Sequence, residues 1–533
     1  MSYDRNTKIL SGIDVPPFYH PNLTLGEFFL HYLQRDSTRI IQTNHDDGVE
    51  MSAGEMARLG CSIAAGLLKH LKTGDVVGIV CKNTTYLAAL VLGSVLAGTP
   101  ISAVDPVFSS KEISHFFDLT KPKMIFCDGD NMDKLKEVLR QCKIDCKLVT
   151  VDEKVAGSEY LFDIIETSGT DSQFSPRRPT TLASQNCAVI LCSSGTTGHP
   201  KACMLSHQQC MTLTKAGPYY VKLFSFSKMY WVTGFTGLMQ SLANNINRII
   251  TKCNFSPELF VEIIEKHRVN AIVIPPPIAA LLLKSEIVKK ADFSSIFVAI
   301  LAGGPMDVSA RKEFQKYLKV GSIVMTYSMT ETGSLISSTA PFEPITNSCG
   351  KPSANIKIKI IDQDGKSLDA LQIGEICVIV PYKFLGYSNN KDETEKAFDS
   401  DGWLRTGDLG YINEGGEIFV TDRQKESFDQ LNFVVYPSML ESWIDKMNGV
   451  NAVCVVGIRD SADFHAAAVV VKEAGSSITE KEIVDEIAKN FLNAQQLHGG
   501  VYFVESLPMT STGKIKRLEA RAIAEKMTDQ KRQ

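Results

Sequence analysis

The chain has 533 residues, of which 44% are hydrophobic and 22% are charged, an ordinary composition for a globular protein with several cores. The formal net charge is −4, so no basic excess attracts a nucleic acid or an anionic membrane surface. We therefore expect no nucleic-acid partner, although local lysines could still hold a small anion.

The ends of the chain and its cysteines bear on location. The N-terminal stretch MSYDRNTKILSG lacks an apolar signal core, and the longest mostly apolar run, YLAALVLGSVLAG, is too short to span a bilayer. The last residues, Lys531-Arg532-Gln533, do not form a Ser-Lys-Leu peroxisomal address. Thirteen scattered cysteines indicate free thiols in a reducing compartment. We expect a cytoplasmic protein without a transmembrane segment, and the oligomeric state stays open.

Between Gly74 and Val151, short apolar runs alternate with helical stretches. The runs DVVGIVC, PISAV, KMIFC and KLVTV predict strands, and helices are expected over 86–97 and 132–141. This alternation indicates an α/β sheet with helical crossovers. After a polar segment that contains prolines, CAVILC predicts a buried strand leading into the sequence SSGTTGHPK.

The alternation then resumes and later changes character. SPELFVEIIEKHRV predicts a helix, and NAIVIP, IFVAILAGG and SIVMTYSMTE predict strands. After about residue 350 the pattern becomes β-rich, with the runs NIKIKIID, GEICVIV and GEIFVTD. The last hundred residues add three more strand patterns and a helix that starts with a capping box of Thr479 and Glu482. This last part reads as a small α+β domain.

The stretch SSGTTGHPK has the composition of a phosphate-binding loop. It combines flexible glycines, hydroxyl donors and a terminal cation: Ser193, Ser194, Gly195, Thr196, Thr197, Gly198 and Lys201. Glycines let backbone N–H groups approach phosphate oxygens closely. The glycines are three apart and a proline precedes the lysine, so the stretch is not a Walker A loop and the chain is not a P-loop kinase. Its place directly after a predicted buried strand favours a phosphate cradle over a surface loop.

Five further motifs follow in order. They are LAGGP (301–305), YSMTETG (327–333), GWLRTGDLGY (402–411), TDRQKE (421–426) and PMTSTGKIKR (508–517). Their order and approximate spacing resemble those of adenylate-forming enzymes, which include acyl-CoA synthetases, adenylation domains of peptide synthetases and luciferases. Within this group the chain is most similar to the 4-coumarate:CoA ligase and firefly-luciferase branch. The resemblance extends from about residue 25 to about residue 520.

This resemblance implies an α/β fold with two domains. A large N-terminal domain, 1–423, would contain α/β subdomains and a β-rich subdomain and would bind ATP and the acid. A small, mobile α+β domain, 424–533, would carry a catalytic lysine. The family's chemistry has two halves: a carboxylate attacks the α-phosphorus of ATP to give acyl-AMP and pyrophosphate, and coenzyme A then displaces AMP. ATP, Mg²⁺ and coenzyme A are the implied cofactors and co-substrates.

The resemblance also assigns roles around the nucleotide. The loop from Ser193 to Lys201 would enclose the β- and γ-phosphates. Thr330 would donate to the α-phosphate, and Glu331 would hold Mg²⁺. Tyr327 would stack on adenine, while Gly303 and Gly304 would let the backbone approach the nucleotide.

Further roles fall on the later motifs. Asp408 and Arg423 match the pair that binds the ribose hydroxyls, and Lys425 matches the hinge position. Lys514 matches the lysine that bridges the incoming carboxylate and the α-phosphate. The neighbouring Lys516 and Arg517 are expected to be solvated surface side chains.

Two regions depart from the family pattern. Asp429 stands where a lysine is usual and Asn432 where a glycine is usual, in a segment used for the thioester half-reaction. The sequence YWVTGF, with Trp231, Val232 or Thr233 at the acyl pocket, replaces a His-His-Gly run of the luciferases. The second departure argues against luciferin as substrate.

The leading hypothesis is an ATP-dependent acyl-CoA synthetase, an acid–thiol ligase, for an apolar acid of the fatty or aryl-propenoic kind. One alternative is a paralogue that binds nucleotide or acyl-adenylate but has impaired turnover, which Asp429 and Asn432 motivate. A luciferase-like monooxygenase is the other. The acid itself, the efficiency of the thioester step and the physiological pathway stay open.

Overall fold

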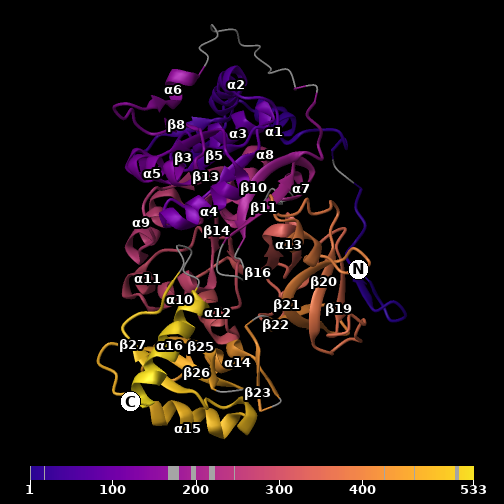
Figure 1. Cartoon of the computed structure of the whole chain (residues 1–533), viewed down its shortest axis with the longest axis vertical. Helices are drawn as coiled ribbons and strands as arrows, with labels where there is room; N and C mark the ends of the chain where they lie inside the picture. Colours follow the sequence, from indigo (N-terminus) through magenta and orange to yellow (C-terminus); the bar gives the residue numbers. More distant parts are fainter. Residues whose placement is uncertain are drawn as a thin grey trace. The chain divides into compact units, whose positions relative to one another are not determined.

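The computed structural model describes residues 2–16, 19–165, 179, 181–193, 200–214, 222–244, 246–424, 426–431, 433–460, 463–509 and 515–532. These residues gather into two compact units. The larger unit comprises Ser11–Lys357 and Ile379–Trp403, and the smaller unit comprises Met1–Leu10, Ile358–Val378 and Leu404–Gln533. Figure 1 labels their helices and strands along the chain.

The first sheet of the larger unit has seven strands, and β5 lies at its centre. Their order is β11 (Lys201–Ser206), β10 (Cys187–Ser193), β6 (Ile101–Ala103), β5 (Val77–Val80), β7 (Met124–Cys127), β8 (Lys147–Thr150) and β9 (Glu159–Tyr160). Every neighbouring pair is parallel except β10 and β11, which form an antiparallel pair. The α/β sheet expected from the alternating runs is therefore confirmed, including the strand that leads into SSGTTGHPK.

The second sheet of the larger unit has nine strands. Their order is β18 (Lys351–Pro352), β17 (Ser334–Ser338), β16 (Ser322–Met329), β15 (Val298–Leu301), β14 (Ala271–Ile274), β12 (Lys222–Phe224), β13 (Asn247–Ile250), β3 (Ile40–Asn44) and β4 (Glu50–Ser52). The pairs from β16 through β3 are parallel. Their apolar side chains form a buried core with α9 and α10.

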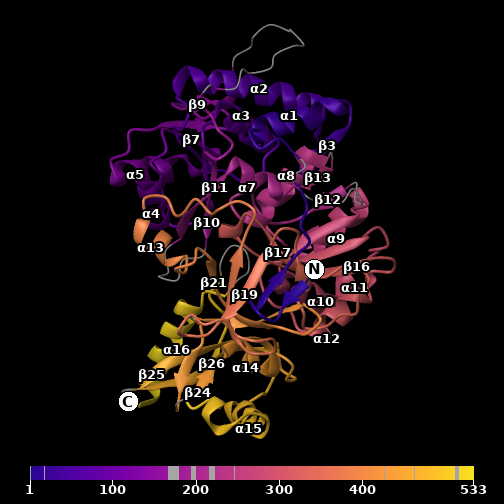
Figure 2. The ribbon, with the colours of Figure 1, turned by 90° about the vertical axis from the view of Figure 1, so that its right-hand side faces the viewer.

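Helices connect and cover these strands. They are α1 (Leu25–Arg35), α2 (Ala53–His70), α3 (Leu87–Ala97), α4 (Ser110–Thr120), α5 (Met132–Cys142), α6 (Leu161–Ile164), α7 (His207–Thr212), α8 (Val232–Asn244), α9 (Pro257–His267), α10 (Pro276–Lys284), α11 (Glu286–Lys290), α12 (Val308–Gln315) and α13 (Lys391–Lys396). Figure 2 shows α1, α2 and α3 side by side. The longest apolar run of the sequence forms α3, whose residues are all buried, as expected for a helix that is apolar on every face.

The smaller unit begins with a six-stranded sheet. Its order is β1 (Ser2–Asp4), β2 (Ile9–Ser11), β19 (Lys357–Ile361), β20 (Gly374–Ile379), β21 (Leu404–Ile412) and β22 (Ile418–Arg423). The β-rich pattern after residue 350 is confirmed. The two N-terminal strands, which the sequence analysis did not assign, extend this sheet beside β19.

The C-terminal part of the smaller unit has the expected α+β character. Strands β25 (Val450–Asp460), β26 (Asp463–Lys472) and β27 (Gly500–Val504) form one sheet, and β23 (Phe428–Gln430) pairs with β24 (Phe433–Val435). The helices are α14 (Pro437–Ile444), α15 (Glu480–Asn490) and α16 (Arg517–Arg532). The predicted capping box is present, since Thr479 accepts from the Glu482 backbone and Glu482 accepts from the Thr479 backbone. The fold class is confirmed, whereas the boundary at 423/424 and the mobility of the C-terminal domain stay predictions.

Two expectations from composition can be compared with the structure. All thirteen cysteines are free thiols, as predicted, and eight of them are buried. Among the helices in the described ranges, none combines the length and the apolar character that crossing a membrane requires.

Candidate functional site

The predicted phosphate loop is anchored by two paired strands. In the β10–β11 ladder, Ser193 lies opposite Lys201, so the loop begins and ends on adjacent backbone positions. The Ser193 hydroxyl is buried and has no hydrogen-bond partner among the described residues. A buried hydroxyl without a partner is unfavourable, and a bound anion would accept its proton.

Several predicted site residues lie outside the described residues. In the loop these are Ser194, Gly195, Thr196, Thr197 and Gly198. In the later motifs they are Lys425, Asn432 and Lys514. Their roles stay predictions from the resemblance.

Thr330 and Glu331 lie beside the base of this loop. They begin a single 3₁₀ turn, η2 (Thr330–Thr332), which packs against both β10 and β11. Gly333 ends the turn with a φ of 56°, and a Cβ there would lie 2.9 Å from the Gln209 side chain. Glycine is therefore required for the close packing of η2 on α7. The structure thus brings the ends of the loop, Thr330 and Glu331 together in the larger unit.

Tyr327 and the predicted glycine pair lie at the ends of neighbouring strands. Tyr327 is buried near the end of β16, and a bulge between Tyr327 and Ser328 shifts the register with β17. Such a bulge changes the direction in which the following side chains point. Gly303, after β15, has a φ of 96°, and a Cβ on Gly304 would meet no atom within 4 Å. The backbone after β15 is therefore open to a ligand.

The structure shows a hydrogen-bond partner of Glu331 that the sequence analysis missed, Tyr387. The Tyr387 hydroxyl donates to Glu331 Oε1 at 2.8 Å. Burial raises the pKa of this tyrosine, and the negative charge of Glu331 raises it further, so the hydroxyl keeps its proton. Tyr387 therefore holds one oxygen of the Glu331 carboxylate in a fixed orientation.

The surroundings of Glu331 suit its predicted role as a Mg²⁺ ligand. Among the described residues, no group of three or more acidic, His or Cys side chains could cage a metal ion. Mg²⁺ commonly uses only one or two carboxylates together with substrate phosphates and water. Tyr387 occupies Oε1, and no described side chain donates to Oε2. A single carboxylate oxygen beside a phosphate loop suits a Mg²⁺ ion that arrives with ATP.

Lys201 has two partners that the sequence analysis also missed. Its ammonium donates to Glu393 Oε2 at 2.6 Å and lies 4.7 Å from the centre of the Tyr387 ring. The side chains of Lys201 and Glu393 are only 14% and 24% exposed. The lysine predicted to hold phosphate is therefore paired with a carboxylate.

The predicted ribose pair is present in the smaller unit. Asp408 of β21 lies opposite Arg423 of β22, and Arg423 Nε is 2.9 Å from Asp408 Oδ1. Asp408 is buried, whereas the Arg423 side chain is about half exposed. Since a guanidinium orients a carboxylate through hydrogen bonds, this arrangement can present the carboxylate to two vicinal hydroxyls.

The expectation that Arg517 is a solvated surface side chain is wrong. Its guanidinium is largely buried, pairs with Glu441 on α14 and lies 2.9 Å from Glu426. It also donates to the Val455 carbonyl at 2.7 Å. Lys516 does point to solvent and pairs with Glu519. The difference arises because Arg517 begins α16 against β25, a contact that the local sequence does not reveal.

The pKa of the buried Asp422 carboxyl provides a test of the structure at the end of β22. It accepts hydrogen bonds from the Arg423 and Ser438 backbones and from the Ser438 hydroxyl. Burial raises its pKa from 3.8 to about 6, although these bonds and the charge of Arg517 oppose the shift. Because the folded-state pKa lies above the unfolded value, folding favours the protonated form. The resulting stabilisation is complete below about pH 4 and is lost as the pH rises through about 6.

We therefore expect the free energy of unfolding of the natural protein, relative to Asp422→Asn, to fall between about pH 4 and pH 6 and to be constant above about pH 7. Urea titrations of both proteins across this range would measure the difference. A difference that did not change with pH would contradict the buried environment of Asp422.

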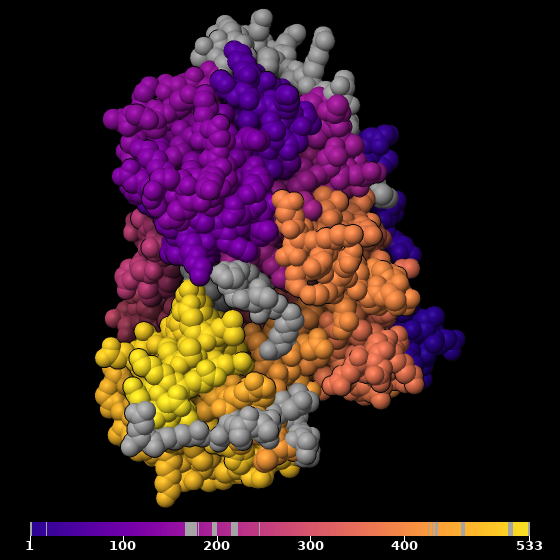
Figure 3. Space-filling view, viewed as in Figure 1, coloured from indigo at the N-terminus to yellow at the C-terminus, as the bar shows by residue number. Residues whose placement is uncertain are grey.

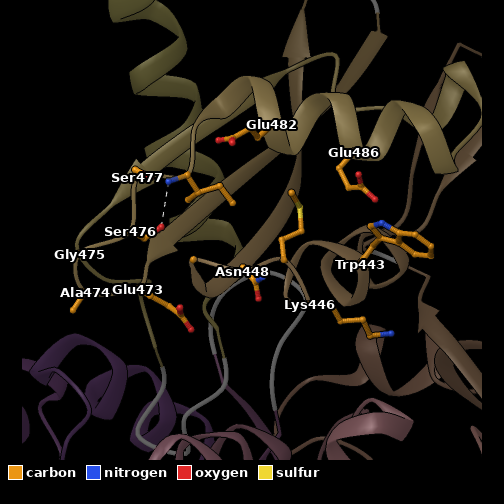
Figure 4. Close-up of a pocket in the computed structure, with 13 residues that line it drawn as sticks. Trp443, Lys446, Asn448, Glu473, Ala474, Gly475, Ser476, Ser477, Glu482 and Glu486 are labelled. Atoms are coloured by element: carbon orange, nitrogen blue, oxygen red, sulfur yellow. Dashed lines mark hydrogen bonds between the residues drawn. The ribbon is translucent and has the colours of Figure 1, made fainter.

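A cavity of about 870 Å³ lies elsewhere, between α14, α15 and the turn that follows β26. Figure 4 shows Trp443 and Lys446 on one side and the carboxylates of Glu473, Glu482 and Glu486 around it. None of the predicted site residues that the structure describes lines this cavity. Its acidic lining would repel a triphosphate, so it is not a candidate nucleotide site.

The structure describes parts of both segments that depart from the family pattern. Asp429 lies in β23, opposite Val434 of β24, and the neighbouring Leu431 has a φ of 52°, which non-glycine residues rarely adopt. Trp231 packs edge-on against Phe108 beside the core of the seven-stranded sheet. The predicted apolar wall NAIVIPPPIAALLL forms β14 and α10, whose buried side chains belong to the core under the nine-stranded sheet. No acyl pocket follows from these contacts.

Comparison with known proteins supports the resemblance. The family model of AMP-binding enzymes matches residues 31–388, and the model of the AMP-binding enzyme C-terminal domain matches residues 439–514. The chain is 28% identical to luciferin 4-monooxygenase of Luciola mingrelica, over 97% of this chain and 95% of the relative. It is 28% identical to 4-coumarate-CoA ligase 1 of Narcissus pseudonarcissus, over 95% of both chains. A probable 4-coumarate–CoA ligase 3 of Dictyostelium discoideum is 30% identical, over 96% of this chain and 98% of the relative.

Solved structures share the fold. ATP-bound MatB from Rhodopseudomonas palustris superposes with a TM-score of 0.84 at 24% identity, covering 95% of this chain and all of that chain. The luciferase-like enzyme from the nonluminescent mealworm Zophobas morio gives a TM-score of 0.73 at 25% identity, covering 79% of this chain and all of that chain. These likenesses confirm the fold expected from the motifs.

Proposed function

Because the chain belongs to the family of AMP-binding enzymes, we propose that it activates an apolar carboxylic acid as an acyl-adenylate and then transfers the acyl group to coenzyme A. Family membership and the 4-coumarate–CoA ligase relatives support the enzyme class, an acid–thiol ligase, and this class implies the use of ATP and coenzyme A. The fatty or aryl-propenoic nature of the acid and a cytoplasmic location are parts of the proposal.

One observation carries the proposal. The larger unit gathers the orphaned Ser193 hydroxyl, Lys201, Thr330 and Glu331 at the carboxyl end of β10 and the start of β11. Hydroxyl donors, a cation and a single metal-binding carboxylate together match the charges of a Mg²⁺-bound triphosphate.

We assign the first half-reaction to these residues. The loop from Ser193 to Lys201 binds the β- and γ-phosphates, and Thr330 donates to the α-phosphate that the acid attacks. Glu331, oriented by Tyr387, holds Mg²⁺, which neutralises part of the triphosphate charge when it is bound. Lys514 meets the negative charge that develops between the carboxylate and the α-phosphate.

The remaining assignments concern the nucleoside. Tyr327 stacks on adenine, and the open backbone at Gly303 and Gly304 lets the nucleotide approach the end of β15. Asp408, oriented by Arg423, accepts hydrogen bonds from the ribose hydroxyls.

A panel of fatty and aryl-propenoic acids, scored separately for pyrophosphate release and for thioester formation, tests the whole proposal. We expect at least one apolar acid to support acid-dependent pyrophosphate release with ATP and Mg²⁺ and to yield its coenzyme A thioester. A short polar acid such as acetate serves as the control and should support neither step. Absence of acid-dependent pyrophosphate release with every acid would contradict the proposal.

Two alternative functions give different results in the same experiment. If Asp429 and Asn432 impair the second half-reaction, pyrophosphate release will be followed by bound acyl-adenylate without thioester. The similarity to luciferin 4-monooxygenases motivates a separate measurement of light emission with luciferin, ATP and oxygen. We expect no light, because the sequence YWVTGF, with Trp231, Val232 or Thr233 at the acyl pocket, replaces the His-His-Gly run.

A further inference from the structure

The short segment around Tyr387 is built to reach the base of the phosphate loop. The Met204 backbone donates to Gly386 and the Ser388 backbone donates to Ala202, so this segment lies alongside β11 on the side opposite β10. Gly386 has a φ of 105°, and a Cβ there would lie 2.6 Å from the Thr394 side chain. A glycine is therefore needed to connect the segment to α13.

Helix α13 then places Glu393 beside Lys201. The Asn390 side chain caps the helix by accepting from the Glu393 backbone, and none of the residues of α13 is buried. Figure 3 shows the surface of this part of the larger unit in orange. Glu393 points inward to Lys201, whereas Lys391, Asp392, Glu395 and Lys396 of the same helix are exposed.

Glu393 has a second cation on its outer side. Its Oε2 atom accepts from Lys201 at 2.6 Å, whereas its Oε1 atom is 3.1 Å from the ammonium of Lys396. The bond from Lys201 and then the bond from Lys396 lower the pKa of Glu393, so the group is a carboxylate at neutral pH. It can leave Lys201 and remain paired with Lys396, which is 72% exposed.

Lys201 itself needs an anionic partner. Its side chain is mostly buried against Tyr387, and a buried cation without a counter-charge is strongly unfavourable. The ring of Tyr387 stabilises the ammonium through a cation–π contact but does not neutralise its charge. In the structure, Glu393 supplies that charge.

We propose that Glu393 competes with the phosphates of ATP and of pyrophosphate for Lys201, and that its return to Lys201 assists the departure of pyrophosphate. This inference rests on the proposed function, which assigns Lys201 to the β- and γ-phosphates. A bound phosphate displaces the carboxylate toward Lys396. After adenylation the carboxylate takes the ammonium back, so Lys201 is never left without a partner and pyrophosphate is held less tightly. Glu393 is thus a positioning residue that sets the affinity of the phosphate loop.

Glu393→Gln tests the competition directly, because it removes the charge but keeps the shape. Isothermal titration with inorganic pyrophosphate and, separately, with ATP, both in the presence of Mg²⁺, should show binding about fivefold tighter than in the natural protein. Glu395→Gln is the matched control. It removes the same charge from the same helix and should leave both affinities unchanged. Among the described residues, the ion-pair partner of Glu395 is the exposed Lys391, at 3.6 Å.

A double-mutant cycle with Lys201→Ala separates direct competition from a general charge effect. In that background Glu393→Gln should have no effect on the binding of either ligand. Three results would overturn the inference while leaving the proposed function intact. They are unchanged or weaker binding by Glu393→Gln, tighter binding by Glu395→Gln, and tighter binding by Glu393→Gln in the Lys201→Ala background. Failure of the natural protein to bind ATP and pyrophosphate would overturn both. A misfolded variant could not gain affinity, so tighter binding is not explained by a folding defect.

Discussion

Replacing Lys514 with alanine should lower acid-dependent ATP–pyrophosphate exchange by about 100-fold or more. The proposed role of this lysine is to meet charge that develops in the transition state, and loss of one such contact typically has an effect of this size. Because the lysine acts on the reacting groups rather than on the nucleoside, the affinity for ATP should change much less than the exchange rate.

Lys516→Ala is the matched control for this variant. Lys516 belongs to the same motif, but its side chain is 39% exposed, and its one ion-pair partner among the described residues is Glu519 at 3.0 Å. It should keep nearly full exchange activity. Full activity of Lys514→Ala would remove its catalytic role and would leave the motif as a structural feature of the C-terminal domain.

Replacing Arg517 with methionine should lower the free energy of unfolding of the smaller unit by about 3 kcal/mol or more. The guanidinium neutralises two carboxylates, Glu426 and Glu441, and the latter is itself mostly buried. Methionine fills a similar volume but leaves both carboxylates without their counter-charge. Urea denaturation followed by circular dichroism and by tryptophan fluorescence, to which Trp443 on α14 contributes, would measure the loss.

The neighbouring substitution Lys516→Met controls for the change in composition. It should alter the free energy of unfolding by no more than about 0.5 kcal/mol, because the Lys516 side chain is partly exposed and pairs with a residue that is itself at the surface, Glu519. Adding Glu441→Gln to Arg517→Met should recover part of the lost stability, since it removes one of the stranded charges. A loss below about 1 kcal/mol in Arg517→Met would show that the ion cluster is solvated and would contradict the packing of α16 described above.

The Arg517 cluster also has a bearing on the proposed mechanism. Arg517 follows Lys514 by three residues, and its partner Glu426 follows the predicted hinge residue Lys425 directly. The first turn of α16 is therefore tied to the segment after the hinge. A rigid connection at this point would keep the base of the lysine motif in a defined place, as catalysis by a positioned cation requires.

Part of the candidate site could be predicted from the sequence because its residues belong to short motifs that can be recognised in the chain. The run CAVILC predicts the buried strand that leads into SSGTTGHPK, and this strand is found as β10. The antiparallel partner that places Lys201 opposite Ser193 appears only in the structure. The resemblance also paired Asp408 with Arg423, and the structure has them 2.9 Å apart. By contrast, nothing in the local pattern around Tyr387 or Glu393 distinguishes them from other loop and helix-surface residues.

The sequence by itself determined the alternation of strands and helices between Gly74 and Val151, the change to a β-rich pattern after about residue 350, the capping box at Thr479 and the class of chemistry. These depend on residues close together in the chain, where apolar periodicity and short motifs record the local environment. Only the tertiary structure decided that strands β1 and β2 extend the sheet beside β19, that Arg517 is buried between two carboxylates, and that Tyr387 and Glu393 meet Glu331 and Lys201. Each of these contacts joins segments that are dozens to hundreds of residues apart. Such pairs leave no periodic signal in the sequence, because their partners are chosen by the packing of the whole chain.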